Sequence, residues 1–279
     1  MEFIVGVLPQ ANSKEFKRFN MKYGICALSI VPCRLEASDP SEMVSQLLFG
    51  EIYRVIDERK NWIKIRASHD GYESWICRKQ HLEIKRDDFM AFEKNPRTFS
   101  NDLISLIHEN KTESFSPLVL GSVLPNFNQS SISFLNKGYV FDGETIHNPS
   151  QGRDLLIETA FLYLNAPYLW GGRTPFGIDC SGYSQIIYRM CGVDLPRDAA
   201  QQAEVGDRLS FIEEATPGDL AFFDNKEGRI THVGILLGDN KIIHASGKVR
   251  VDRIDHQGIF NDEMHDYSHH LRLITRVIK

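Results

Sequence analysis

The chain has 279 residues, of which 42% are hydrophobic and 25% charged, and its net charge is −5. This length is enough for two or three domains with hydrophobic cores of their own. The negative charge argues against a nucleic-acid partner, and no apolar run approaches the roughly 18 residues that a transmembrane helix requires.

The first nine residues make a poor signal peptide, because they lack a basic start and a continuous apolar core. We therefore expect a cytoplasmic protein if Met1 is the native start, and a periplasmic or secreted one if a signal peptide has been removed. The five cysteines form no obvious disulfide framework, which suits a reducing compartment.

Residues 1–88 are predicted to form a small β-barrel domain. Short alternating runs at 23–32, 51–57, 62–66 and 72–76 are separated by turn signals. Several short strands at such spacing are typical of a barrel.

A connector and a second, more divergent barrel are predicted over residues 89–150. Residues 86–115 are polar, with a modest helical stretch at 102–108, and apolar runs follow at 118–124 and 137–141. A helix over 153–165 then begins a third domain, predicted to span residues 151–279.

Cys180 is the most informative residue of this third domain. Asp179 is a good N-cap, and the apolar spacing after it predicts a helix up to Met190, with Cys180 in the first turn. The helix dipole favours an anion there by about 0.3–1 kcal/mol, and a nearby imidazole lowers a thiol pKa much further. The pattern therefore predicts a nucleophilic thiolate.

Two histidines follow in what we interpret as a β-hairpin, because turn residues 238–240 separate the apolar runs that hold His232 and His244. A three-residue loop places both histidines on one face, one diagonal step apart, whereas a two-residue loop places them on opposite faces. In the first case His232 can act as the base for Cys180, and His244 can orient it. A zinc site made of the same three residues is the alternative, but no metal-binding spacing supports it.

Six runs in the third domain carry a strong resemblance to the NlpC-type (NlpC/p60) cysteine peptidases of bacterial cell-wall peptides. These runs occur in the family's order at 167–172, 177–182, 195–202, 217–223, 231–235 and 243–246. The resemblance implies an α+β, papain-like domain with Cys180 as nucleophile, His232 as general base and His244 as third member. It also implies that Tyr168 helps to hold the oxyanion and that Arg197 is a structural charge.

The first barrel resembles the bacterial SH3-like domains that accompany wall peptidases, through its runs at 48–51, 61–65 and 71–76. Relatives with this domain order include cytoplasmic recycling enzymes of the dipeptidyl-peptidase VI type, which require a free N-terminal L-Ala. The resemblance implies that an acidic barrel residue reads the ammonium group, since a buried ammonium needs a paired carboxylate. The candidate substrate-binding residues are Glu51, Tyr72, Asp179 and Ser181, with Glu73 as an alternative to Glu51.

The resemblance thus implies a monomeric cysteine endopeptidase that cleaves the γ-D-glutamyl–diamino acid bond of murein peptides in recycling, without a metal or cofactor. Three alternatives stay open: a general cell-wall hydrolase, a thiol acyl- or amide-transferase, and a wall-binding module without activity.

Overall fold

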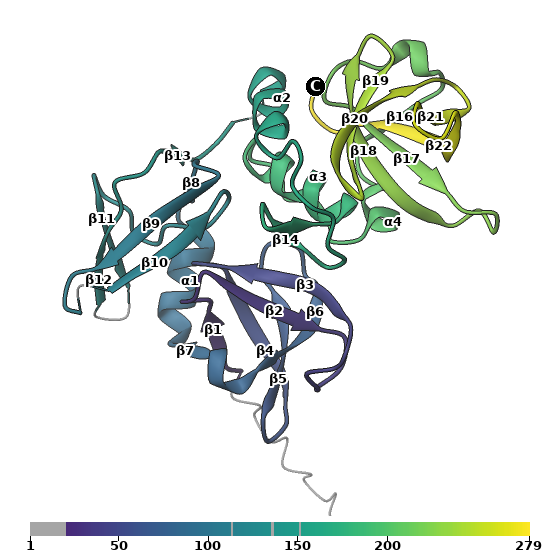
Figure 1. Cartoon of the computed structure of the whole chain (residues 1–279). Helices are drawn as coiled ribbons and strands as arrows, with labels where there is room; N and C mark the ends of the chain where they lie inside the picture. Colours follow the sequence, from purple (N-terminus) through teal and green to yellow (C-terminus); the bar gives the residue numbers. More distant parts are fainter. Residues whose placement is uncertain (1–20, 113, 135–136, 151) are drawn as a thin grey trace, which may run out of the picture.

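The computed structural model describes residues 21–112, 114–134, 137–150 and 152–279. Residues 1–9, considered above as a signal peptide, lie outside this part of the chain. Three groups of elements follow one another in the sequence and meet around helix α3 (Figure 1). Within the described residues, none of the helices has the length and apolar character needed to cross a membrane.

The first group is a seven-stranded antiparallel sheet, here called the first sheet, in the order β3-β2-β6-β5-β4-β1-β7. Alternating residues such as Ile63 and Ile65 on one strand point into its core, as the sequence pattern predicts. The predicted run at 23–32 is divided into two strands by a turn. The bounds are β1 (Tyr23–Ile25), β2 (Ile30–Arg34), β3 (Met43–Leu48), β4 (Ile52–Glu58), β5 (Trp62–Ala67), β6 (Glu73–Cys77) and β7 (Leu82–Ile84), with a 3₁₀ turn at Arg78–Gln80.

The connector differs from the prediction. Its helix is α1 (Arg86–Lys94), and the stretch predicted as helical is strand β9 (Ile104–Glu109). Helix α1 packs Phe89 into a core shared by Tyr23 of the first sheet and Ile107 of β9. Strand β9 forms because it pairs with strands on both sides, which outweighs the weak helical preference of an isolated segment.

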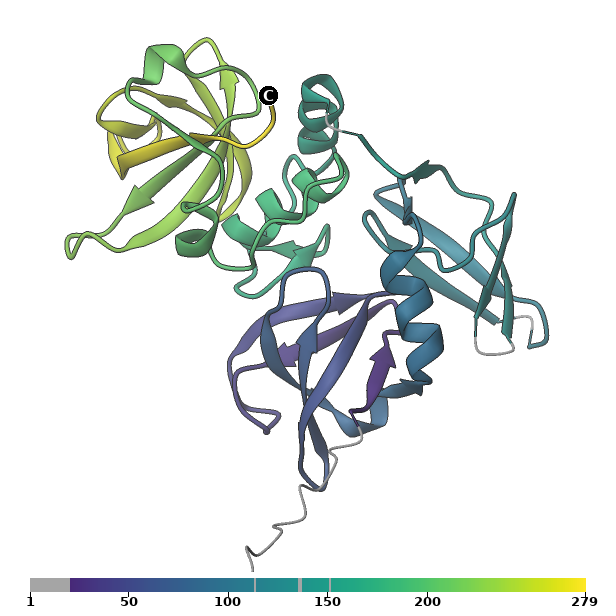
Figure 2. The same ribbon diagram turned by 180° about the vertical axis from the view of Figure 1, so that it is seen from behind.

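The second group contains a four-stranded sheet in the order β10-β9-β12-β11 and the separate pair β8–β13. Figure 2 shows it beside α1 and the first sheet. Its remaining strands are β8 (Thr98–Ser100), β10 (Ser114–Val119), β11 (Ser131–Phe134), β12 (Lys137–Val140) and β13 (Thr145–His147).

In the third group, helices pack against a β-barrel. The barrel is the sheet β22-β17-β18-β19-β20-β21, which is closed because β21 also pairs with β22, and β16 pairs with the outer edge of β22. This arrangement confirms the α+β class. Its elements are α2 (Arg153–Leu162), β14 (Arg173–Thr174), β15 (Gly177–Ile178), α3 (Cys180–Arg189), α4 (Ala199–Gln202), β16 (Asp207–Leu209), β17 (Leu220–Asp224), β18 (Ile230–Gly238), β19 (Lys241–Ser246), β20 (Lys248–Ile254), β21 (Gly258–Asn261) and β22 (Asp266–Arg276), with a 3₁₀ turn at Ile212–Glu214.

Candidate active site

Cys180 is the first residue of α3, as its sequence context predicts. The Asp179 carboxylate caps the helix by accepting a 2.7 Å hydrogen bond from the Gly182 amide. Its other oxygen accepts a 2.8 Å bond from the Gly171 amide, which ties the preceding glycine-rich loop to the helix start. The residues around Cys180 therefore hold its backbone in one place.

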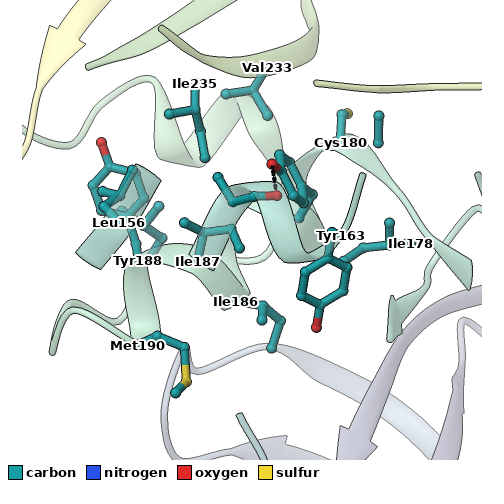
Figure 3. Close-up of a cluster of buried hydrophobic side chains, with 14 of the residues drawn as sticks. Leu156, Tyr163, Ile178, Cys180, Ile186, Ile187, Tyr188, Met190, Val233 and Ile235 are labelled. Atoms are coloured by element: carbon teal, nitrogen blue, oxygen red, sulfur yellow. Dashed lines mark hydrogen bonds between the residues drawn. The ribbon is translucent and has the colours of Figure 1, made fainter. Parts of the chain in front are cut away.

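The Cys180 side chain is only 6% exposed and lies at the edge of the apolar cluster that joins α3 to β18, close to Val233 (Figure 3). The Val233 backbone forms a hydrogen bond with the sulfur. Burial, together with the negative charge of Asp179, nevertheless raises the pKa of the Cys180 thiol to about 12. The cost of desolvation exceeds the helix-dipole effect of about 0.3–1 kcal/mol, so the resting thiol is protonated rather than a preformed thiolate.

The two histidines lie on one face of the β18–β19 hairpin, although the turn differs from the predicted three-residue loop. Gly234 pairs with His244, which is the register that an odd loop predicts. The turn itself has two residues, Asp239 and Asn240, both with positive φ, and a β-bulge between Leu236 and Gly238 supplies the extra residue. The bulge restores the parity that brings the histidines together.

His232 is the first member of a buried chain of hydrogen bonds. Its Nε2 lies 2.8 Å from His244 Nδ1, and His244 Nε2 lies 2.9 Å from the Asp252 carboxylate on β20. An ionised carboxylate only accepts hydrogen bonds, so His244 Nε2 carries a proton and donates to Asp252. His244 Nδ1 is then unprotonated and accepts a hydrogen bond from the N–H at His232 Nε2. This assignment leaves His232 Nδ1 unprotonated and available as a base.

The surroundings of His232 favour its neutral form. Burial lowers the pKa of His232 well below its usual value, with further contributions from His244 and His269. The His269 ring stacks on His232 with ring centroids 4.1 Å apart, and Phe223 approaches at 5.8 Å. A neutral imidazole is the form that can accept the proton of the Cys180 thiol.

Asp252 itself stays ionised. Burial favours its neutral form, but hydrogen bonds from His244 and Arg250 outweigh burial and lower its pKa. Arg250 Nε lies 2.8 Å from the Asp252 carboxylate. The end of the chain is therefore a fixed negative charge.

Tyr168 lies near the nucleophile, and its role at the oxyanion stays a prediction. Its backbone bridges to Ile178, two residues before Cys180, and its amide donates to the Gly247 carbonyl at 3.0 Å. Burial raises the Tyr168 pKa to about 12, and the neighbouring Cys180 contributes. The hydroxyl therefore keeps its proton and remains a hydrogen-bond donor.

Asp179 and Ser181 are joined by Arg197, which is 2% exposed. Arg197 donates to both carboxylate oxygens of Asp179, at 3.1 and 2.6 Å, and to the Ser181 hydroxyl at 2.9 Å. This agrees with a structural role for Arg197. It also means that both predicted substrate-binding residues already have partners within the protein.

The first sheet reaches the same region. Tyr72 hydrogen-bonds to Asp198, next to Arg197, and burial together with the Asp198 charge raises the Tyr72 pKa to about 12. The exposed Glu42 accepts a 2.5 Å bond from the Trp170 indole in the loop before Cys180. Tyr72 thus lies at the contact between the first sheet and the third group, and its role in substrate binding stays a prediction.

Glu51 is a correction to the sequence prediction. Glu51 is 2% exposed, and its carboxylate accepts hydrogen bonds of 2.9 and 3.0 Å from Arg173. It also accepts hydrogen bonds from the Leu48 amide and from Arg189, which lies at the opposite end of α3 from Cys180. These positive charges outweigh burial and lower the Glu51 pKa far below its usual value. Glu51 therefore fastens the first sheet to α3 and offers no free carboxylate. The alternative, Glu73, is exposed and pairs with Arg66 and Lys64.

The sequence analysis missed three residues of this region, namely Asp252, His269 and Glu42. Asp252 lies on β20, which pairs directly with the strand of His244, and His269 lies on β22, which is separated from the strand of His232 by β17. Glu42 lies in the loop between β2 and β3. The alternating pattern of β20 could have indicated Asp252 as a buried polar residue, but no local signal marks the other two.

Comparison with known proteins identifies two domain types in the chain. Residues 165–267 match the NlpC/P60 family, and residues 34–80 match the bacterial dipeptidyl-peptidase SH3 domain. A γ-D-glutamyl-L-lysine dipeptidyl-peptidase of Bacillus cereus is 26% identical over 236 residues, which cover 76% of this chain and 70% of the relative. Its Bacillus subtilis counterpart is 28% identical over 233 residues, with 76% and 75% covered.

A solved structure supports the fold. The crystal structure of an NlpC/P60 family protein from Bacillus cereus superposes with a TM-score of 0.78 at 21% identity, covering 92% of this chain and all of that one. The papain-like α+β fold with an N-terminal SH3-like domain is thereby confirmed. The chain carries an NlpC/P60 domain, of the peptidase type, behind a bacterial SH3 domain.

Proposed function

We propose that the chain is a cysteine peptidase that hydrolyses the γ-D-glutamyl–diamino acid bond of cell-wall peptides with a free N-terminal L-Ala, in peptidoglycan recycling. The observation that carries this proposal is the Asp252–His244–His232 chain. The strands of its two histidines, β18 and β19, pack against α3, whose first residue is Cys180. The names of the Bacillus relatives support the choice of bond.

In the proposed mechanism the thiol and the base react from their neutral forms. His232 Nδ1 removes the Cys180 proton as the sulfur attacks the γ-D-glutamyl carbonyl, and a C–S bond forms. The Cys180 backbone N–H and the Tyr168 hydroxyl donate to the oxyanion. His232 then gives its proton to the departing amine, and water hydrolyses the thioester to release L-Ala-D-Glu.

During this cycle the imidazolium of His232 is stabilised through His244 by the charge of Asp252. The three groups are nearly dry, since His232 is 6% exposed and His244 1%. Charge stabilisation is stronger in such surroundings than in water, so the chain favours the step in which charge develops.

The free N-terminus is proposed to be read at the contact between the first sheet and the loop before Cys180. Glu42, in the loop before β3, is an exposed carboxylate that contacts this loop, and Tyr72 lies at the same contact. We propose Glu42 in place of Glu51 as the residue that pairs with the ammonium, because Glu51 is already occupied by two arginines.

The test uses L-Ala-γ-D-Glu-L-Lys and the meso-diaminopimelate peptide, each with a free and an acetylated N-terminus, with products identified by mass spectrometry and Cys180→Ala as control. We expect hydrolysis of the free peptides only, and a raised KM for them in Glu42→Gln. Equal cleavage of acetylated peptides would support a general cell-wall hydrolase. A new amide would support a transferase, and binding without turnover a wall-binding module.

A further inference from the structure

A cavity of about 250 Å³ lies where the first sheet, the end of α1, the second group and the end of α3 meet. Its lining contains none of the candidate active-site residues around Cys180. The residues that matter here are Glu51, Ser68, His69, Glu93, Arg189 and Asp194.

The side edge of the Arg189 guanidinium makes no hydrogen bond to the residues that the structure describes. The residue is 1% exposed, and its Nη1 donates to Glu51 and, at 3.4 Å, to the Gly121 carbonyl. Its Nε and Nη2 have no hydrogen-bond partner among the residues that the structure describes. These two nitrogens together form the fork that binds a carboxylate with two parallel hydrogen bonds.

Asp194, the second acidic group beside Arg189, does not fill this fork. Asp194 Oδ1 lies 3.7 Å from Arg189 Nε, beyond hydrogen-bonding distance. Its carboxylate is bound instead by Arg97, at 3.1 and 2.8 Å. Glu93 likewise pairs with Arg54 at 3.1 Å. The acidic residues of the lining therefore already have arginine partners.

One further buried group of the same lining, Ser68 Oγ, has no hydrogen-bond partner in the described part of the chain. His69 Nε2, by contrast, lies 3.2 Å from the Asp70 carboxylate and pairs with it. Buried donors are rarely left unpaired, and where several gather around one cavity a ligand or ordered water completes them. The two unpaired nitrogens of Arg189 can only donate, so their missing partner is an acceptor, and the Ser68 hydroxyl can donate to the same acceptor.

We propose that this cavity is a second binding site, which takes a small monocarboxylate held by the Nε and Nη2 atoms of Arg189 with help from Ser68. A single negative charge fits better than a phosphate dianion, because Glu51 and Asp194 are close. Apolar lining residues such as Phe92 and Leu124 suit a short aliphatic chain. The ligand joins the first sheet to the last turn of the helix that begins with Cys180.

The test is isothermal titration and thermal unfolding of the full chain with propionate, with propionamide as the neutral isostere and inorganic phosphate as the dianion, at constant ionic strength. We expect propionate to bind with a dissociation constant of about a millimolar, in keeping with its few heavy atoms, and to raise Tm. Propionamide and phosphate should do neither.

Two variants and a crystal structure with propionate complete the test. Arg189→Lys keeps a positive charge for Glu51 but loses the fork, so propionate affinity should fall about tenfold. Ser68→Ala removes one donor and should weaken binding less while leaving the fold intact. The proposal is overturned if propionate and propionamide act alike, if neither variant weakens binding, or if only water occupies the fork. Binding is measured without turnover, so peptidase activity does not affect the outcome.

Discussion

Asp252 offers the sharpest test of the proposed base. His244 Nε2 lies 2.9 Å from its carboxylate, and His244 is 1% exposed. A buried hydrogen bond to a charged group contributes about 1.5–3 kcal/mol. In Asp252→Ala the His244 ring can reverse its tautomer, which reverses that of His232 and places a proton on the nitrogen that must act as base.

If the whole of that free energy orients His232, kcat/KM should fall about 10–150-fold, since about 1.4 kcal/mol corresponds to a factor of ten. The assay is peptide hydrolysis followed by mass spectrometry, combined with ¹⁵N NMR of the histidine rings to identify the tautomer. Asp262→Ala is a matched control, because Asp262 is an exposed acid of the neighbouring hairpin that pairs with Arg253. An Asp252→Ala enzyme within threefold of wild type, with His232 still protonated at Nε2, would refute the reasoning.

Three further predictions follow from the burial of particular groups. The pKa of the Cys180 thiol is raised to about 12, so little thiolate is present at pH 7. Iodoacetamide at pH 7 should therefore label Cys180 about a thousandfold more slowly than free cysteine. Labelling as fast as that of free cysteine would mean a preformed thiolate. Glu51→Gln should lower the free energy of unfolding, measured by denaturant titration, by about 3–5 kcal/mol, because it breaks a buried ion pair. Glu73→Gln, at an exposed position, should lower it by at most about 1 kcal/mol. Similar losses in the two variants would contradict the argument from the buried pair. His269→Phe should keep kcat/KM within about threefold of wild type, because it retains the ring stacked on His232. In His269→Ala the stack is lost, and kcat/KM should fall about 2–13-fold. Equal decreases in kcat/KM would show that the imidazole itself is needed.

Local patterns in the sequence predicted much of the candidate site. The N-cap at Asp179 placed Cys180 at the start of a helix, and the hairpin parity placed both histidines on one face. The predicted strand register was correct, although the predicted three-residue loop was not. Burial of one face of β18 and β19 fixes the register, and the bulge adjusts the turn to that register. The predicted domain boundaries remain predictions.

The parts that failed depend on contacts between distant segments. Glu51 follows a strand in the sequence and resembles an ordinary loop carboxylate, but Arg173 and Arg189, more than 100 residues later, bury it. Strand β9 forms through its pairing with β10 and β12 rather than from its own preference. The thiol pKa depends on the packing of α3 against β18, which a sequence pattern does not report.

The most direct test of the central claim is intact-protein mass spectrometry of the enzyme, acid-quenched during turnover of L-Ala-γ-D-Glu-meso-diaminopimelate. The account predicts a fraction of protein heavier by one L-Ala-γ-D-Glu acyl group, mapped by peptide digestion to Cys180 and absent from Cys180→Ala, which should also release no product. Undiminished hydrolysis by Cys180→Ala, with no adduct on the wild-type protein, would contradict it.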